Sequence, residues 1–122
     1  MQSDKETNLN NRDYEAVDSE EVKLEDRVRG NLRRVIDPEI GINIIDLGLI
    51  YNIDVNEEND VQILMTLTAP NCPYGDMILM ETEFAVRSVK GTNLVNINLT
   101  FDPPWNPDQH VSDEAKYQMG VL

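Results

Sequence analysis

The sequence contains a single cysteine and a single histidine in 122 residues. One cysteine cannot form a disulfide within the chain, so Cys72 is a packed thiol, a reactive thiol or a ligand whose partners come from elsewhere. A zinc site built by this chain alone is not expected, because His110 has no second histidine or cysteine close to it in the sequence.

Basic residues are also scarce. The chain has 10 Lys and Arg against 23 Asp and Glu, which gives a formal net charge of -13. Such a chain offers no basic stripe to a phosphate backbone, and it is repelled by anionic membranes. No apolar run reaches the roughly 18 to 20 residues of a membrane span, and the first ten residues do not have the pattern of a signal peptide. We therefore expect a cytoplasmic protein that binds neither nucleic acid nor membrane.

The chain is predicted to form one domain behind a short tail. Its length suits a single domain of about 100 to 150 residues. Residues 1–18 hold too few apolar side chains to offset the entropy of ordering them, which predicts a disordered acidic tail. That tail could make the protein more soluble or dock a basic partner. Residues 19–122 are the predicted folded domain.

Three helices are predicted, over residues 19–36, 73–90 and 113–120. The first has apolar side chains at helical spacing, Asp18 or Ser19 as its cap, and a stop at Asp37-Pro38 because the residue before a proline leaves the helical region. Ser112 is the expected cap of the last helix.

Three strands are predicted between these helices. Residues 50–55 and 61–67 flank the polar turn "NEEND" and are expected to pair as a hairpin. Apolar Leu64 interrupts the alternation of the second strand, which predicts that this strand is covered on both faces. The third strand alternates, with an inward set of Val95, Ile97, Leu99 and Phe101. The sum is an α+β fold, a small two-layer sandwich with a mixed sheet of about three strands and three helices.

Cys72 stands one residue before a proline that could open the second helix. At or near the N-cap, unpaired backbone N–H groups and the helix dipole favour the thiolate, which could act as a nucleophile or as a soft-metal ligand. A buried, unreactive cysteine is the alternative. A Cys-His-Asp hydrolase could be assembled from Cys72, His110 and either Asp37 or Asp102, but nothing in their spacing requires them to converge.

Two further segments hold candidate functional residues. In "DPEIG", Asp37 and Glu39 could hold a cation or move a proton, although the same residues make an ordinary helix exit and turn. In "FDPPWNP", Pro103 and Pro104 stiffen a loop around Trp105, whose large ring suits either a partner surface or a cover over the core.

Three segments together resemble a known family: "VIDPEIGINIIDLGLIYNIDV", "MTLTAPNCPYGD" and "LTFDPPWNPDQHVSDEAKYQMGVL". From about Val22 to Leu122 they are similar, in the same order, to the metal-sulfur cluster biosynthesis family that includes SufT and is related to PaaD. The resemblance implies a compact α+β fold and a bacterial auxiliary factor in iron-sulfur protein maturation, not an enzyme. It also implies a functional site. The residues at the family's site positions are Cys72, Asp37, Glu39 and Thr68.

Ligand number limits the mechanism that this resemblance implies. An iron-sulfur cluster takes about four thiolate or equivalent ligands, and each chain offers one. No tightly bound cofactor is therefore expected, and Cys72 would be a transient cluster ligand or would share a cluster that bridges a homodimer. The implied partners are iron-sulfur scaffold or carrier proteins and client apo-proteins. Trp105, Pro103 and Pro104 would contact them.

Other functions remain open. An adaptor could bind carrier and client without touching the cluster, and an enzyme could turn over a small thioester or amide through Cys72. A PaaD-like accessory of an aromatic-ring oxygenase system is a further alternative. PaaD relatives typically carry a cysteine-rich C-terminal extension, and its absence from this sequence favours the SufT-like function.

Overall fold

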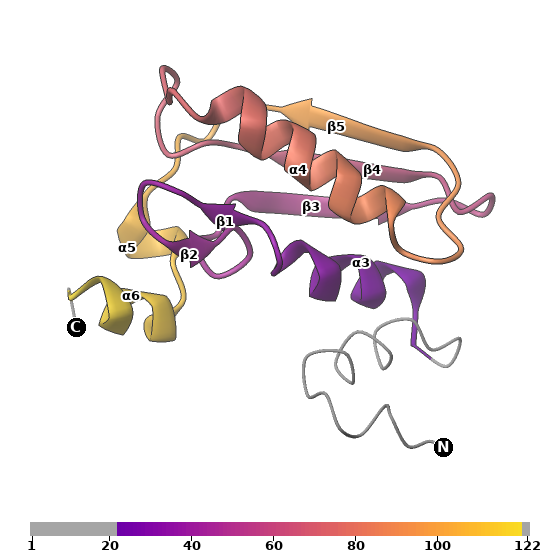
Figure 1. Ribbon diagram of the computed structural model, residues 1–122, viewed down its shortest axis with the longest axis horizontal. Coiled ribbons are helices and arrows are strands. Elements are labelled where there is room, and N and C mark those ends of the chain that lie inside the picture. The colour runs from indigo at the N-terminus through magenta and orange to yellow at the C-terminus, as the bar shows by residue number, and fades with distance from the viewer. Residues whose placement is uncertain (1–21, 121–122) are drawn as a thin grey trace.

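The computed structural model of the chain describes residues 22–120 (Figure 1). The predicted acidic tail, and Asp18 and Ser19 as helix caps, lie outside the described residues. In chain order the elements are α3 (Leu24–Leu32), β1 (Ile36–Asp37), β2 (Ile42–Asn43), β3 (Ile50–Val55), β4 (Val61–Met65), α4 (Gly75–Arg87), β5 (Val95–Leu99), α5 (Pro107–His110) and α6 (Asp113–Met119).

The main sheet has three strands in the order β3-β4-β5. β3 and β4 form the predicted antiparallel hairpin, while β4 pairs with β5 in parallel, and α4 connects those two strands. Figure 1 shows α4 lying across one face of the sheet, and α3 contacts both α4 and β3. The prediction of a two-layer α+β fold with a three-stranded mixed sheet is confirmed.

The core lies between this sheet and the two long helices. β4, the central strand, turns Val61, Ile63 and Met65 inward, and all three are fully buried. Its outward residue Leu64 is exposed, so the prediction that both faces of the strand are covered is wrong. Leu99 is also exposed rather than inward, because β5 is an edge strand with a neighbour on one side only.

Helix α3 ends earlier than predicted. Leu32 is its last residue, and the predicted continuation to position 36 is wrong. The backbone after Leu32 bonds across a turn instead: β1 pairs with β2 in antiparallel fashion, and the N–H of Ile44 donates to the carbonyl of Val35. This pairing competes with the helix for the same backbone groups, and the local sequence does not reveal it.

The C-terminal region contains two short helices where one was predicted, so residues 22–120 hold four helices rather than three. The unpredicted α5 is capped by Asn106, whose side-chain oxygen accepts from the N–H of Asp108 at 2.9 Å. For α6 the predicted cap is confirmed, since the Ser112 hydroxyl oxygen accepts from the N–H of Ala115 at 3.1 Å. In Figure 1 both helices lie beside β1 and β2.

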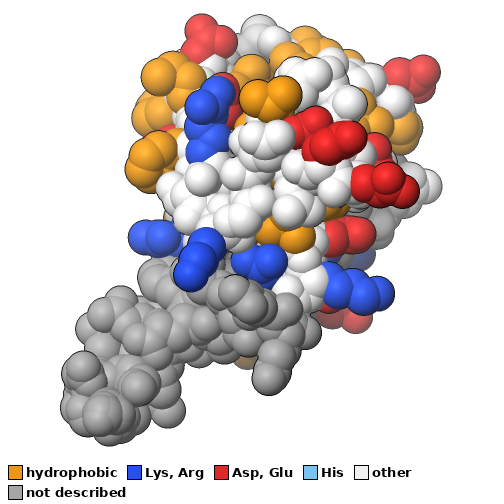
Figure 2. Space-filling model, turned by 90° about the vertical axis from the view of Figure 1, so that its right-hand side faces the viewer, with side chains coloured by type: hydrophobic (Ala, Val, Ile, Leu, Met, Phe, Trp, Pro, Cys, Tyr) orange, Lys and Arg blue, Asp and Glu red, His pale blue; other side chains and the backbone are white. Residues whose placement is uncertain are grey.

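The surface carries charges of both signs. Figure 2 shows Lys and Arg side chains mostly in a band next to the grey residues, with Asp and Glu side chains at several separate places above it. The Lys and Arg side chains of this band are separated by uncharged side chains. Of the helices within residues 22–120, none is long and apolar enough to cross a membrane.

Candidate functional site

Cys72 lies in the loop that joins the central strand β4 to α4. The loop turns tightly, since the N–H of Cys72 donates to the carbonyl of Ala69 at 3.2 Å and the N–H of Gly75 donates to the carbonyl of Cys72 at 3.1 Å. A Cβ at Gly75 would come within 2.8 Å of Leu67 Cδ1, so a larger residue there would need the Leu67 side chain to shift.

Cys72 lies near the N-cap of α4 and not at it. Tyr74 is the N-cap of α4, and Cys72 lies three residues before the first helical residue, Gly75. A helix that began at Pro73 would have placed Cys72 at the cap, but α4 begins two residues later, at Gly75. The backbone N–H of Tyr74 still bonds to the Cys72 sulfur.

Glu39 is the side chain that reaches this sulfur. The Cys72 thiol donates to Glu39 Oε1 across 3.7 Å between sulfur and oxygen. Cys72 is half-buried and Glu39 is exposed, so an incoming molecule can approach both groups from solvent. The structure therefore brings together two of the residues that the sequence selected.

The Asp37 carboxylate accepts hydrogen bonds from the backbone of the turn that carries Glu39. It is fully buried in β1, and its Oδ1 accepts from the N–H of Glu39 at 2.9 Å and from the N–H of Ile40 at 3.3 Å. Its Oδ2 is buried and has no hydrogen-bond partner among residues 22–120. The "DPEIG" turn is real, but it is entered from a strand and not from a helix end.

The surroundings of Cys72 favour the thiol rather than the thiolate. Burial raises the pKa of the Cys72 thiol above its ordinary value, and the negative charges of Glu39 and Asp37 raise it further. The bond from the Tyr74 N–H acts in the opposite direction but is outweighed. The predicted preference for a thiolate is therefore wrong, because burial and the two carboxylates outweigh the single N–H at the start of α4 that reaches the sulfur.

Thr68 is half-buried in the same loop, and its side chain makes no hydrogen bond within the described part of the chain. A different threonine is fully buried just after β4. Thr66 donates to the Leu67 carbonyl at 3.4 Å and also bonds to the Tyr51 hydroxyl. The functional role of Thr68 stays a prediction.

Trp105 covers the core. The ring is half-buried against the core, and its Nε1 donates to the carbonyl of Leu47 at 2.7 Å. Pro103 and Pro104 are exposed, and the Pro103 carbonyl accepts from the Tyr51 hydroxyl at 2.8 Å. A partner contact at this loop stays a prediction, and it would involve the prolines more than the indole ring.

His110 interacts with Asn106 and Tyr51 and not with Cys72. Its Nδ1 accepts from the backbone N–H of Asn106 at 2.8 Å, and its ring lies 5.3 Å from the Tyr51 ring between centroids. No hydrogen bond joins it to Cys72 in the stretch from residue 22 to residue 120, so the Cys-His-Asp arrangement is not formed. Over the same stretch, no group of three or more His, Cys, Asp or Glu could hold a metal ion.

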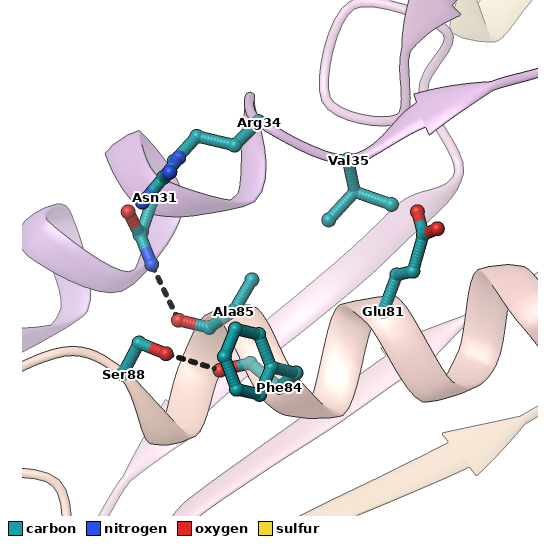
Figure 3. Close-up of a pocket in the computed structure, with 7 residues that line it drawn as sticks. All are labelled: Asn31, Arg34, Val35, Glu81, Phe84, Ala85 and Ser88. Carbon is teal, nitrogen blue, oxygen red and sulfur yellow. Dashed lines mark hydrogen bonds between the residues drawn. The ribbon is translucent and has the colours of Figure 1, made fainter.

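A cavity of about 300 Å³ lies away from this site, between the end of α3 and α4 (Figure 3). Figure 3 shows Asn31 facing α4, where its side-chain amide donates to the carbonyl of Ala85. The sequence did not select Asn31, although an amide between Val28 and Leu32 on the apolar helix face is a signal of a buried bond.

The part of the chain that carries these residues matches a family model. The model is described as an iron-sulfur cluster assembly protein, and it matches residues 25–99, which is more than half of the chain. The chain belongs to the iron-sulfur cluster assembly protein family. All four predicted site residues, Asp37, Glu39, Thr68 and Cys72, lie inside the matched region, while Trp105 lies beyond it.

Named relatives agree with this family. The chain is 47% identical over 106 residues to an Fe-S protein maturation auxiliary factor of Porphyromonas gingivalis, and the match covers 87% of this chain and 100% of that protein. It is 37% identical over 87 residues to the Fe-S protein maturation auxiliary factor SufT of Staphylococcus aureus, which covers 71% of this chain and 98% of the other. The resemblance to the SufT group is confirmed.

A solved structure supports the fold of this iron-sulfur cluster assembly protein. The crystal structure of a domain of unknown function from Bacillus anthracis superposes with a TM-score of 0.76 at 33% identity, over 81% of this chain and 93% of that one. The mixed three-stranded sheet with its helices is therefore a shared architecture.

Proposed function

We propose that this protein is an auxiliary factor in iron-sulfur protein maturation, and that Cys72 is a labile ligand while a cluster passes to a client apo-protein. The observation that carries the proposal is the contact between the Cys72 sulfur and Glu39 Oε1, at a half-exposed position in the family region. Relatives named as maturation auxiliary factors support the pathway.

The cluster is cargo in this scheme. One cysteine per chain supplies one of about four ligands, so the others come from the donor, from the client or from a second copy. Cys72 can therefore share a cluster during transfer but cannot keep it. The partners are a scaffold or carrier protein on one side and an apo-protein on the other.

Glu39 supplies the proton acceptor. When the Cys72 sulfur binds iron, its S–H bond breaks, the proton moves to the Glu39 carboxylate, and a carrier thiolate leaves the iron. When a client thiolate displaces Cys72, the proton returns to the sulfur. No electron is gained or lost by the protein in either step.

The raised pKa of Cys72 suits a ligand that must leave again. Burial and the nearby carboxylates favour the protonated sulfur, which raises the pKa and disfavours a lasting bond between thiolate and iron. Such a thiol must give up its proton to bind iron, and it takes the proton back when the client thiolate displaces it.

Complementation tests the proposal. A host strain that lacks the gene would receive the native chain, Cys72→Ser, Glu39→Gln or Glu83→Gln at matched soluble levels, and an iron-sulfur dehydratase would be assayed under iron limitation. The native chain and Glu83→Gln are expected to restore activity, since Glu83 pairs with Arg87 on another part of α4. Cys72→Ser is expected to fail, and Glu39→Gln to restore activity only in part.

Two results would oppose this proposal in different ways. Full rescue by Cys72→Ser would make the protein an adaptor that does not touch the cluster. If neither the native chain nor any variant restores the dehydratase activity, the protein does not act in this pathway.

A further inference from the structure

An apolar strip runs along the outer face of α4. Met77, Met80 and Phe84 share one face because they are three and four positions apart, and Tyr74 at the N-cap continues it. Met80 is 70% exposed and Phe84 is 72% exposed. Together with Glu81, the three helical residues line a groove of about 490 Å³. We call Tyr74, Met77, Met80 and Phe84 the α4 strip.

The core does not need this strip. The opposite face of α4 buries Ile78, Thr82, Ala85 and Val86, which is the stripe that a helix uses to pack on a sheet. The large apolar side chains of the strip lie on the other face and do not pack into the core. Exposed apolar groups that gather in this way mark interaction sites, and flexible methionines adapt to varied partners.

Two of the charged side chains beside the strip are acidic and unpaired. Asp76 and Glu81 form no ion pair or side-chain hydrogen bond among residues 22–120, whereas Glu83 is held by Arg87 at 2.8 Å. Glu81 also lines the adjoining cavity of Figure 3, where it points from α4 toward Val35. A partner that places Lys or Arg beside its apolar side chains would therefore complement the strip.

A second copy of the chain fits the strip poorly. Each copy carries a net charge of -13, so two copies repel each other. Partly exposed side chains of this size offer about 100 to 150 Å² each, roughly 500 Å² in all, which is below the about 800 Å² per partner of a stable interface. The area suits a transient contact. Residues 1–21 of the chain would also complement the acidic side chains beside the α4 strip poorly, because they contain seven Asp or Glu and only two Lys or Arg.

We propose that the α4 strip docks an amphipathic helix of a partner protein whose apolar face is flanked by Lys or Arg. The strip begins at Tyr74, whose backbone N–H bonds to the Cys72 sulfur, and extends about 15 Å along the helix. A helix seated there lies next to the cysteine. Assigning this partner to the maturation pathway rests on the proposed function, but the docking itself does not.

A labelled synthetic peptide tests the docking directly. The probe is an amphipathic peptide of about 18 residues, or five helical turns, with Leu on one face and Lys beside it, titrated with the full chain by fluorescence anisotropy. A matched peptide carries Glu in place of Lys. The Lys peptide is expected to bind at least about tenfold more tightly.

Substitutions in the strip test whether the peptide binds there. Met80→Ser and Phe84→Ser are each expected to weaken binding by about tenfold, and Glu81→Gln by a few-fold with a weaker dependence on salt. Tyr117→Ser is the control, since Tyr117 is 74% exposed in α6 and away from the strip. All of these side chains are on the surface, and equal melting temperatures would show that the variants fold.

Several outcomes would overturn the docking proposal. These are no binding of the Lys peptide, equal binding of the Glu peptide, or self-association of the native chain that Met80→Ser abolishes. Cys72→Ser separates the two proposals, because it is expected to keep peptide binding. If it also rescues the host cells, the role of the thiol fails while the docking surface stands.

Discussion

The sulfur of Cys72 lies 3.7 Å from Oε1 of Glu39, although 33 positions separate the two residues in the chain. Two turns make this contact. One is folded around the Asp37 carboxylate after β1, and the other precedes α4. The only thiol of the protein therefore faces a carboxylate, whose negative charge adds to the effect of burial in raising the pKa of Cys72.

Replacing Glu39 with Gln should lower the pKa of Cys72. The substitution removes a negative charge that disfavours the thiolate, while burial, the larger cause of the raised pKa, remains. The midpoint of the pH dependence of iodoacetamide alkylation is expected to move to lower pH. Glu83→Gln should leave the midpoint unchanged, and an unchanged midpoint in Glu39→Gln would show that the carboxylate does not act on the sulfur.

The stability of the protein should fall at alkaline pH in a way that depends on Cys72. The folded pKa of this thiol lies above the unfolded value, so its contribution is fully present below about pH 8.5 and is lost as pH rises through the folded pKa. Urea unfolding at a series of pH values would measure this. Tyr51, whose pKa is also raised by burial, is present in both the native chain and Cys72→Ser. A smaller loss of unfolding free energy at alkaline pH in Cys72→Ser would therefore be due to the missing thiol. Identical profiles would contradict the assignment.

Asn31→Ala should destabilise the packing of α3 on α4. The variant leaves the buried carbonyl of Ala85 without the amide that now donates to it, which costs about 1 to 3 kcal/mol of unfolding free energy. Asn96→Ala, on an exposed position of β5, is the matched control and should change stability by less than about 0.5 kcal/mol. Similar values for the two variants would mean that the Asn31 bond adds nothing.

Gly48→Ala should be more damaging than Gly41→Ala. Both glycines have positive φ, 77° and 83°, so an alanine at either position is strained by about 1 to 2 kcal/mol. A Cβ at Gly48 would also lie 2.1 Å from the carbonyl oxygen of His110, whereas at Gly41 nothing lies within 4 Å. Chemical denaturation would compare them. Equal losses would mean that α5 is not held against this segment.

Local patterns predicted much of the fold. Alternation on both sides of "NEEND" predicted the β3 and β4 hairpin, and Ser112 predicted the start of α6, because these signals depend on neighbours in the sequence. The end of α3 was missed because Arg33 to Val35 continue the helical pattern, and the competing pairing comes from residues further along the chain.

Three candidate site residues were selected from the sequence, but the electrostatics around them were not predicted. Asp37, Glu39 and Cys72 were selected from the sequence, and the structure brings them together. The sign of the pKa shift was wrong because burial and the carboxylates of Glu39 and Asp37 outweigh the N–H of Tyr74, and the residues next to Cys72 in the sequence do not reveal these effects.

Three contacts fasten the C-terminal region to one short segment that precedes β3. Trp105 bonds to Leu47, the backbone of His110 presses on Gly48, and the N–H of Ser112 donates to the carbonyl of Asp46. The family match ends at residue 99, before any of these fastenings. A protein cut at that boundary would keep Cys72 and Glu39 but uncover Leu47, so anyone who excises the domain for study should carry the chain past residue 112.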